Sequence, residues 1–373
     1  MTTTDPLGSQ RTARVAWACL SEPADPVAHE LVTRLGLTEA LDLVLHGSAR
    51  ARHRKLDRFA RRVQALDLDG VLRAGERAGA RLVVPGDEEW PEGLADLPRP
   101  PWCLWVRGPA ALGVVLARSV AVVGARAASS YGDFLTGQLA AGLADRGFTV
   151  VSGAAYGIDG AAHRGALAVE GTTVAVVAGG VDRVYPTGHS RLLASIAESG
   201  AVVSEVPPGS APSRTRFLAR NRLIAAMTLG TVVVEAGLRS GALSTAHTAA
   251  ELGRPVGAVP GLVTSSVSAG CHEAVRRGWA TLVTDAEEVA DLVGDVGTDA
   301  APVRRGEERP EDDLDELCRR VLEAIPPYRS RSVDDLARIA ALSAGEVLSS
   351  LGQLEASGLV ERRLDGWGRS RSR

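Results

Sequence analysis

Between residues 119 and 293 the sequence alternates short aliphatic stretches with longer segments that have the apolar spacing of amphipathic helices. The aliphatic stretches are rich in Val and Ala and cover residues 119–123, 149–152, 173–178, 201–204, 231–235, 256–259 and 281–283. Near-continuous apolar runs of this length indicate strands that are covered on both faces. The pattern therefore predicts an α/β fold with a Rossmann-like, doubly wound and mostly parallel sheet, which binds ligands beyond the carboxyl ends of its strands.

Spacing and composition divide the rest of the chain. Apolar positions recur at helical spacing over residues 1–80, which predicts a small helical domain ahead of the sheet domain at 81–297. Residues 298–310 are charged and contain proline, which is typical of a flexible linker. Residues 311–373 contain three helical segments, a polar strand and a Gly-Trp-Gly turn, the outline of a winged helix.

Composition limits the classes of function. The chain has 373 residues with a formal net charge of −3, so any basic surface has to be local. Its four cysteines show no CxxC spacing and no nearby histidine pair, so neither a zinc site nor a disulfide framework is expected. The N-terminus lacks an apolar signal core, and no apolar run is long enough to span a bilayer. We expect a cytoplasmic protein with no membrane partner, metal or cofactor.

Glycine-rich turns follow the first three predicted strands of this alternation. Free backbone N–H groups at a helix start and arginine forks both bind phosphates, so these turns are candidate anion sites. Each turn also has a purely structural interpretation as a change from strand to helix. The candidate residues are Gly124, Arg126 and Ser129 after the first strand, Gly153 and Gly157 after the second, and Arg183 after the third.

The most basic motif lies on a predicted helix. Arg216 and Arg220 share one face at i, i+4 spacing, and we interpret this repulsive arrangement as the sign of an anion between them. Phe217 can stack on a base, or it can pack in the core. Beyond the next strand, a second helix start provides another anion cradle. An extended polyanion fits this set best, so we predict a single-stranded nucleic-acid site that includes Phe217, Arg220, Asn221, Arg222, Arg239, Ser240 and Gly241.

Acid–base chemistry is the main alternative. Asp159 and His163 are four residues apart, but no nucleophile or metal ligand accompanies them, so we interpret them as a helix-orienting carboxylate and a packed histidine. A nucleotide-binding hydrolase similar to phosphoribohydrolases stays open, although their PGGxGTxxE signature is absent around Glu235. A winged-helix transcription regulator also stays open, although the predicted recognition helix at 344–357 contains no Arg or Lys. We do not expect an enzyme.

An ordered set of motifs resembles the DNA processing protein A family, also called DprA or Smf, over about residues 88–285. The motifs are Gly124-Ala125-Arg126, Ser152-Gly153-x-x-x-Gly157-Ile158-Asp159-x-x-Ala162-His163, Tyr185-Pro186, Ser204-Glu205-x-Pro207, Phe217-x-x-Arg220-Asn221-Arg222, Val234-Glu235-Ala236, Arg239-Ser240-Gly241 and Val259-Pro260-Gly261.

The resemblance implies a non-enzymatic protein that binds and protects incoming single-stranded DNA and helps to load the RecA recombinase during natural transformation. It implies a sterile-alpha-motif-like domain at the N-terminus and a homodimer formed near residues 271–279. It carries the family's DNA-contacting turn onto Gly124 and Arg126, its aromatic and arginine cluster onto Phe217, Arg220 and Arg222, and its second cradle onto Ser240 and Gly241. Leu218 stands where the family often has proline, and His189 where it often has asparagine.

Overall fold

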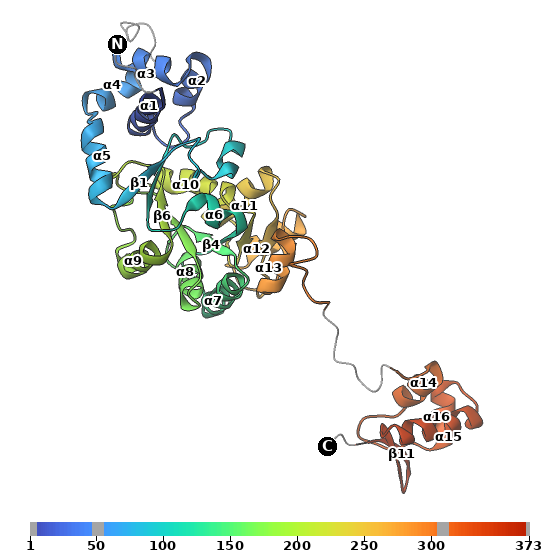
Figure 1. Cartoon of the computed structure of the whole chain (residues 1–373). Helices are drawn as coiled ribbons and strands as arrows, with labels where there is room; N and C mark the ends of the chain where they lie inside the picture. Colours follow the sequence, from blue (N-terminus) through green and yellow to red (C-terminus); the bar gives the residue numbers. More distant parts are fainter. Residues whose placement is uncertain (1–5, 47–55, 304–312, 371–373) are drawn as a thin grey trace. The chain divides into compact units, whose positions relative to one another are not determined.

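The computed structural model describes residues 6–46, 56–303 and 313–370 (Figure 1). The chain divides into two compact units, Met1–Ala301 and Pro302–Arg373. Part of the linker expected at 298–310 lies outside the described residues, because these resume at 313.

A single sheet organises the first unit. Within its described residues nine strands are arranged in the order β1-β2-β6-β5-β4-β3-β7-β8-β9. The strands from β6 to β9 in this order run parallel, whereas β1 and β2 add an antiparallel edge. The parallel strands are β3 (Ser119–Val123), β4 (Thr149–Ser152), β5 (Thr173–Val176), β6 (Ala201–Ser204), β7 (Gly230–Val233), β8 (Val256–Ala258) and β9 (Thr281–Leu282), after β1 (Ala80–Val83) and β2 (Leu104–Arg107). The predicted α/β fold with a mostly parallel sheet is confirmed.

Helices cover both faces because successive residues of each strand point to opposite sides. In β3, Val120 and Val122 join one apolar core, and Ala121 and Val123 join the other. The first core contains side chains of α7 (Ser130–Asp145), α8 (Ile158–Ala168) and α13 (Ala286–Val293). The second contains side chains of α6 (Leu112–Val115), α10 (Arg214–Ala226), α11 (Gly241–Glu251) and α12 (Ala269–Arg276). Residues of α9 (Ser190–Ser199) pack with those of β5 and β6.

The strand order fixes where a ligand can bind. On one side of β3 the sheet continues with β4, β5 and β6, in the order of the chain. On the other side of β3 it continues with β7, β8 and β9. The order therefore reverses between β3 and β7, and such a switch point opens a crevice outside the carboxyl ends of the two strands. The turns that begin at Gly124 and at Gly237 lie at this crevice.

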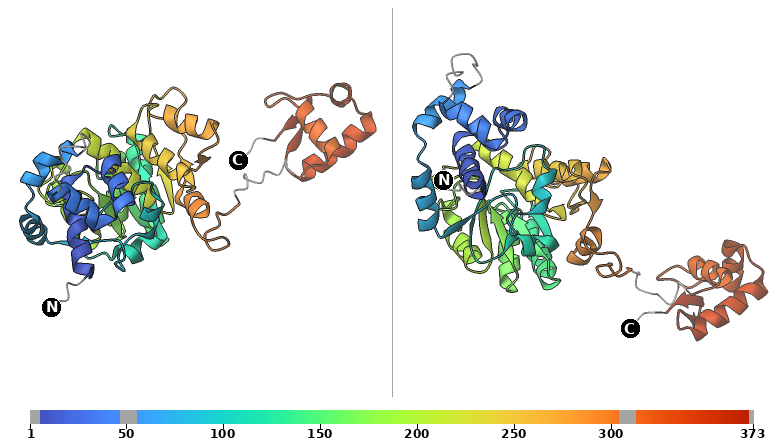
Figure 2. Two further views of the ribbon diagram at one scale, coloured as in Figure 1. Left: turned by 90° about the horizontal axis from the view of Figure 1, so that it is seen from above. Right: turned by 45° about the horizontal axis from the view of Figure 1, so that its top comes forward.

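The N-terminal helices pack around tryptophan. They are α1 (Pro6–Leu20), α2 (Pro26–Leu35), α3 (Leu37–His46), α4 (Asp57–Gln64) and α5 (Leu68–Arg77), and they lie together in each view of Figures 1 and 2. The ring of Trp17 lies 6.0 Å from that of Phe59 and 5.7 Å from that of Trp102. Because Trp102 and Cys103 lead directly into β2, this core joins the helices to the edge of the sheet.

The second unit contains α14 (Glu316–Ala324), α15 (Val333–Ala340) and α16 (Ala344–Ala356), followed by the hairpin of β10 (Val360–Arg363) and β11 (Gly366–Arg369). Val321, Leu336 and Leu351 form its core, and Trp367 packs against it. The three helical segments predicted from the sequence are present here. In the part of the chain that the structure describes, no helix has both the length and the apolar character needed to cross a membrane.

Candidate nucleic-acid interface

A pocket of about 230 Å³ lies at the switch point between β3 and β7. Its walls come from the turn after β3, the start of α8, the first half of α10 and the start of α11. Many of the residues predicted from the sequence line it: Gly124, Arg126, Phe217, Arg220, Asn221, Ser240 and Gly241. The structure therefore brings together motifs that are more than a hundred residues apart in the sequence.

Arg126 is the accessible cation of this pocket. Its guanidinium carbon lies 4.9 Å from the centre of the Phe217 ring. The ring of Tyr185, a residue of the loop at 180–189, lies 5.4 Å from the Phe217 ring. Stacking on an aromatic face orients a guanidinium without using its N–H groups. The side chain of Arg126 is exposed, and no ion pair joins it to another described residue. It can therefore donate to a phosphate.

Arg220 lines the pocket but is almost fully buried. Its side chain is buried, it donates to the carbonyl of Val176, and it packs so closely under Gly153 that a Cβ at that position would collide with the guanidinium. Burial lowers the pKa of Arg220 to about 10, and the neighbouring carboxylate of Asp159 opposes that shift. Burial likewise raises the pKa of Asp159, which accepts from the backbone N–H of Ala155 at 3.3 Å.

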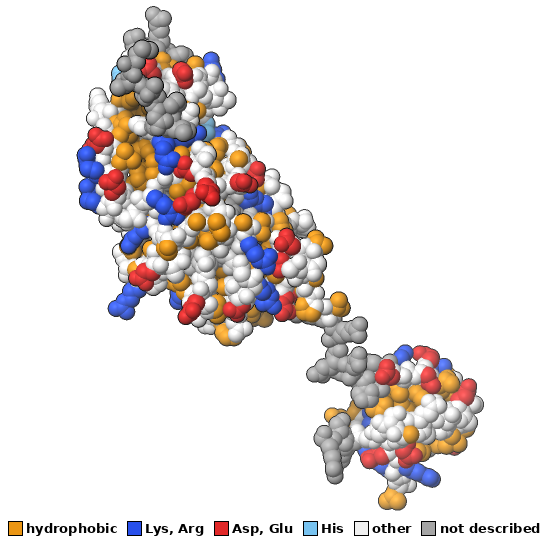
Figure 3. Space-filling view, in the orientation of Figure 1, with side chains coloured by type: hydrophobic (Ala, Val, Ile, Leu, Met, Phe, Trp, Pro, Cys, Tyr) orange, Lys and Arg blue, Asp and Glu red, His pale blue; other side chains and the backbone are white. Residues whose placement is uncertain are grey.

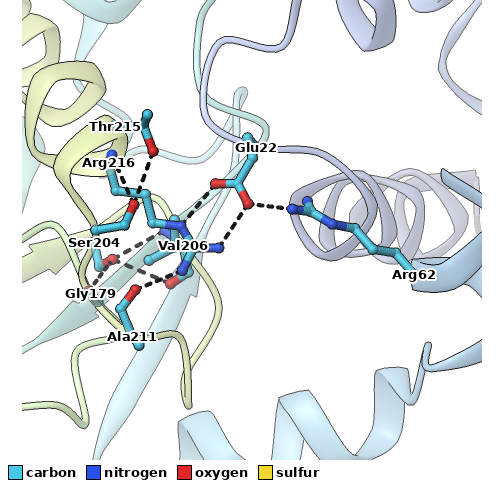
Figure 4. A network of polar contacts seen from close by, with 9 residues as sticks. Glu22, Arg62, Gly179, Ser204, Val206, Ala211, Thr215 and Arg216 are labelled. Atoms are coloured by element: carbon cyan, nitrogen blue, oxygen red, sulfur yellow. Dashed lines mark hydrogen bonds and ion pairs between the residues drawn. The ribbon is translucent and has the colours of Figure 1, made fainter. Parts of the chain in front are cut away.

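The anion that we expected between Arg216 and Arg220 has no place in this arrangement. Arg216 donates to the carboxylate of Glu22 at 2.8 and 3.1 Å, and Glu22 also binds Arg62 of α4 (Figure 4). A carboxylate of the chain itself therefore holds Arg216. The charge of Arg220 is directed into the sheet, so the interpretation of their shared face as an anion clamp is wrong.

Arg222 is held in a buried ion pair with Glu205, and the two side chains are only 13% and 9% exposed. Arg222 does not line the pocket. Its neighbour Asn221 does, and the Asn221 side chain donates to the carbonyl of Gly241 at 3.2 Å, which ties α10 to the start of α11. A Cβ at Gly241 would meet nothing closer than Asn221 at 3.9 Å, so the space at this helix start is open to a ligand.

Ser129 has a different role from the one expected. Its hydroxyl donates to Glu235 at 2.5 Å, its backbone N–H donates to the same carboxylate at 2.9 Å, and its side chain caps α7. The buried carboxylate of Glu235 therefore occupies the start of α7, where we expected free N–H groups to face a ligand. The same two bonds leave Glu235 without an exposed oxygen for acid–base chemistry.

The two glycines after β4 hold the turn in place. Gly157 has φ +75°, and a Cβ there would collide with the carbonyl oxygens of Ala125 and Arg126. Ile158 closes this contact by donating its backbone N–H to Ala125 at 3.1 Å. Gly157 thereby positions the turn that carries Arg126, just as Gly153 makes room for Arg220.

Two predicted cations lie outside the pocket. The side chains of Arg183 and Arg239 are exposed on the loops that follow β5 and β7, but neither lines the pocket.

Sequence reasoning did not select Tyr156, whose ring is exposed beside Ala155 at the pocket wall. The sequence contained a signal for Tyr156, because it is an aromatic residue between Gly153 and Gly157, in a turn that was expected to face a ligand.

The interpretation of His163 is confirmed. Its ring is buried and its Nδ1 lies 2.7 Å from the hydroxyl of Thr173, which itself donates to Val150. Burial lowers the pKa of His163 to about 3. His163 is therefore neutral and packed. Asp182 also has a structural role, because it accepts from the backbone N–H of Gly209 at 2.8 Å.

Two arginines of the wing are engaged within the second unit. Arg369 donates to the carbonyls of Ile325 and Leu322 at 3.0 and 2.9 Å, and Arg363 pairs with Glu361 at 2.8 Å. Arg362 is exposed, and Arg371 lies outside the described residues. The helix α16 carries no arginine or lysine, so it lacks the cations with which a recognition helix usually contacts duplex DNA.

Comparison with known proteins agrees with this geometry. The profile of the family described as DNA recombination-mediator protein A matches residues 81–294, and that of the DprA winged helix domain matches residues 305–366. The chain is 47% identical over 380 residues to a DprA protein of Mycobacterium tuberculosis, with 95% of this chain and 94% of the relative covered. Protein Smf of Escherichia coli is 42% identical over 211 residues, which cover 56% of each chain.

Solved structures give the same result. DNA processing protein A from Streptococcus pneumoniae superposes with a TM-score of 0.65 at 30% identity, covering 79% of this chain and all of that one. The protein from Helicobacter pylori, studied for its single-stranded DNA binding mode, superposes with a TM-score of 0.52 at 28% identity, covering 57% of this chain and 96% of that one. The winged helix predicted from the sequence is confirmed, and the chain belongs to the DNA processing protein A family.

Proposed function

We propose that this protein binds single-stranded DNA in the pocket between β3 and β7, and that it does so without catalysing a reaction. The observation that carries the proposal is the exposed Arg126 guanidinium stacked on Phe217 at the switch point of the sheet. A cation that can reach a phosphate, next to aromatic rings that can stack on bases, is the combination that single-strand binders use. The single-stranded DNA binding described for the Helicobacter pylori relative supports the class of ligand.

The non-catalytic role rests on the carboxylates near the pocket. Asp159 is buried beside Arg220, Glu235 is bonded to Ser129, and Asp182 is bonded to Gly209. None of these carboxylates combines exposure to the pocket with the positioned partner that a general acid or base requires. The hydrolase alternative therefore has little support from the arrangement of these residues.

Family membership also leads us to propose that the protein protects incoming DNA, loads RecA during natural transformation or recombination, and works in the cytoplasm as a homodimer. The region proposed for the dimer, near residues 271–279, adjoins an apolar pocket of about 230 Å³ lined by Val259, Cys271, Val275 and Leu282. Leu282 belongs to β9, the edge strand of the sheet, and is 48% exposed. We also propose that residues 1–80, 81–297 and 311–373 act as separate functional domains.

The proposed site is tested by fluorescence anisotropy with a labelled single strand and its duplex across a salt series. We expect the wild-type protein to prefer the single strand. Arg126→Ala should weaken binding and reduce the slope of log K against log salt by about 0.7, the value for one lost phosphate contact on a single strand. Arg77→Ala is the matched control, because Arg77 is exposed at the end of α5 and does not line the pocket. Equal or duplex-favouring binding that Arg126→Ala leaves unchanged would contradict the assignment.

A further inference from the structure

Tyr156 presents a half-exposed ring at the rim of the proposed site, with 49% of the residue accessible to solvent. It lies between Ala155, which lines the pocket, and Gly157, which contacts the carbonyl of Arg126. An exposed tyrosine alone has no functional meaning, since isolated apolar groups are common on protein surfaces. Three features around Tyr156 distinguish it from such a residue.

The first feature is the way the ring is held. The Tyr156 and His189 rings pack edge to face, with their centres 4.8 Å apart. His189 is fixed in turn by a hydrogen bond of 3.1 Å between Nδ1 and the carbonyl oxygen of Ala154. A Cβ at Gly188 would lie 2.6 Å from the Tyr156 hydroxyl, so this position leaves room for the ring only because it is glycine. The ring is therefore fixed in orientation while one side stays accessible.

The second feature is the backbone that carries the ring. Ala154 has φ +54°, a left-handed conformation that alanine rarely adopts, and Gly157 has φ +75°. A non-glycine residue in this region is strained and persists where the surroundings enforce it, often at a binding site. The turn at 153–157 is therefore held in an unfavourable backbone that places Ala155 at the pocket and Tyr156 beside it.

The third feature is continuity with the aromatic rings of the pocket. The loop at 180–189 contacts Phe217 through Tyr185 near its middle and Tyr156 through Gly188 and His189 at its end. One loop thus connects the Phe217 ring with the Tyr156 ring along the same rim. Arg183, in the same loop, is exposed and is positioned to attract a phosphate backbone that follows it.

We propose that Tyr156 is a second base-stacking platform, on which a base of the strand leaving the Arg126–Phe217 pocket stacks. This proposal rests on the proposed function. It adds that the bound nucleic-acid strand leaves the pocket toward Tyr156. Every base has a π face, so a tyrosine held in this way binds without reading sequence. The ligand is single-stranded, because bases paired in a duplex do not present their faces.

The test compares two labelled strands of equal length, oligo(dT) and a strand of abasic deoxyribose phosphates. Both carry the same phosphates, so the ratio of their dissociation constants reports contacts to the bases, and its change in a Tyr156 variant reports the contribution of that ring. We expect Tyr156→Ala to reduce the preference for oligo(dT) roughly tenfold, while the salt slope stays at the wild-type value because no phosphate contact is lost. Tyr156→Phe should keep the preference. Phe134→Ala should also keep it, because Phe134 is 65% exposed on α7 but does not line the pocket.

Three outcomes would overturn the proposal and are distinct from one another. If Tyr156→Ala keeps the wild-type ratio while Arg126→Ala still lowers the salt slope, the strand is bound at the pocket but does not reach Tyr156. An equal loss in Phe134→Ala would show that the effect is not local to Tyr156. If the wild-type protein shows no preference for single strands and Arg126→Ala has no effect, the proposed function fails and this inference fails with it.

Discussion

Three arginines near the candidate site have three different environments, although sequence reasoning placed all of them in it. Arg126 is exposed over an aromatic ring, Arg220 is buried in the pocket wall and donates to Val176, and Arg222 is paired with Glu205. Successive positions of a helix point in different directions, so Arg220 and Arg222 of α10 meet different neighbours. The charge of a residue thus says little about its role until its partner is known.

Removing one member of the buried pair should therefore affect stability more than binding. Arg222→Met leaves the carboxylate of Glu205 buried without a counter-ion, which typically costs about 3–5 kcal/mol of unfolding free energy. Urea unfolding at pH 7 measures this loss. The double variant Arg222→Met, Glu205→Leu should recover most of it and keep the wild-type salt slope of single-strand binding. A slope lower by about 0.7 in the stable double variant would instead show that Arg222 contacts a phosphate.

His163 should make the fold sensitive to acid. Burial lowers its pKa from 6.5 to about 3, so between these values the unfolded chain binds a proton that the folded chain does not. The contribution of His163 to stability is complete above pH 6.5 and is lost as the pH falls toward 3, by up to about 1.4 kcal/mol per pH unit. His163→Asn should flatten this part of the stability curve, measured by urea unfolding at several pH values. His247→Asn, at an exposed histidine, should leave the curve as steep as in the wild type.

At the scale of elements, the sequence predicted most of the sheet and much less of its edge. The strands β3, β4 and β6 begin and end at the same residues as the apolar runs in the sequence. A strand that is buried on both faces is apolar along nearly its whole length, so its bounds can be read from the run. The short strand β1 was not predicted, since its residues are only partly buried and one of its four is Arg81. Long-range partners were also beyond prediction: Glu22 lies 194 residues from Arg216, and no local pattern connects them.

The start of α8 gives a prediction that separates backbone strain from damage to the site. Gly157→Ala and Gly253→Ala each place a side chain at positive φ, at a cost of about 1–2 kcal/mol of unfolding free energy. A Cβ at Gly253 meets nothing within 4 Å, whereas one at Gly157 collides with the turn that carries Arg126. Denaturant unfolding should show a loss in both variants, and anisotropy should show weaker single-strand binding in Gly157→Ala alone. Equal binding by the two variants would refute the positioning role of Gly157.

At the scale of the whole molecule, the nine-stranded sheet ends in an exposed edge at β9, next to the region proposed for the dimer. Across the visible face in Figure 3, basic side chains lie among acidic ones, in keeping with the net charge of −3. The face seen there has no predominant charge sign, so the proposed association with DNA and with a second copy depends on particular contacts.

A charge on this edge should separate the protomers. Leu282→Glu introduces a carboxylate beside the apolar pocket, and burying it in an interface should raise the dimer dissociation constant by about tenfold or more. Light scattering coupled to size-exclusion chromatography over a range of concentrations measures this change. Val114→Glu is the control, at an exposed apolar residue of α6 that does not line this pocket. A dimer that both variants leave equally stable would place the interface elsewhere.

The position of β3 and β7 at the centre of the strand order has a consequence for synthesis of the chain. The pocket takes one wall from the turn after β3 and another from the start of α11, and these lie more than a hundred residues apart. A chain leaving the ribosome has already completed Arg126 and Phe217 while the residues of α11 are still to be added. Until α11 has docked this wall is missing, so the proposed site is complete only after most of the parallel sheet has been made.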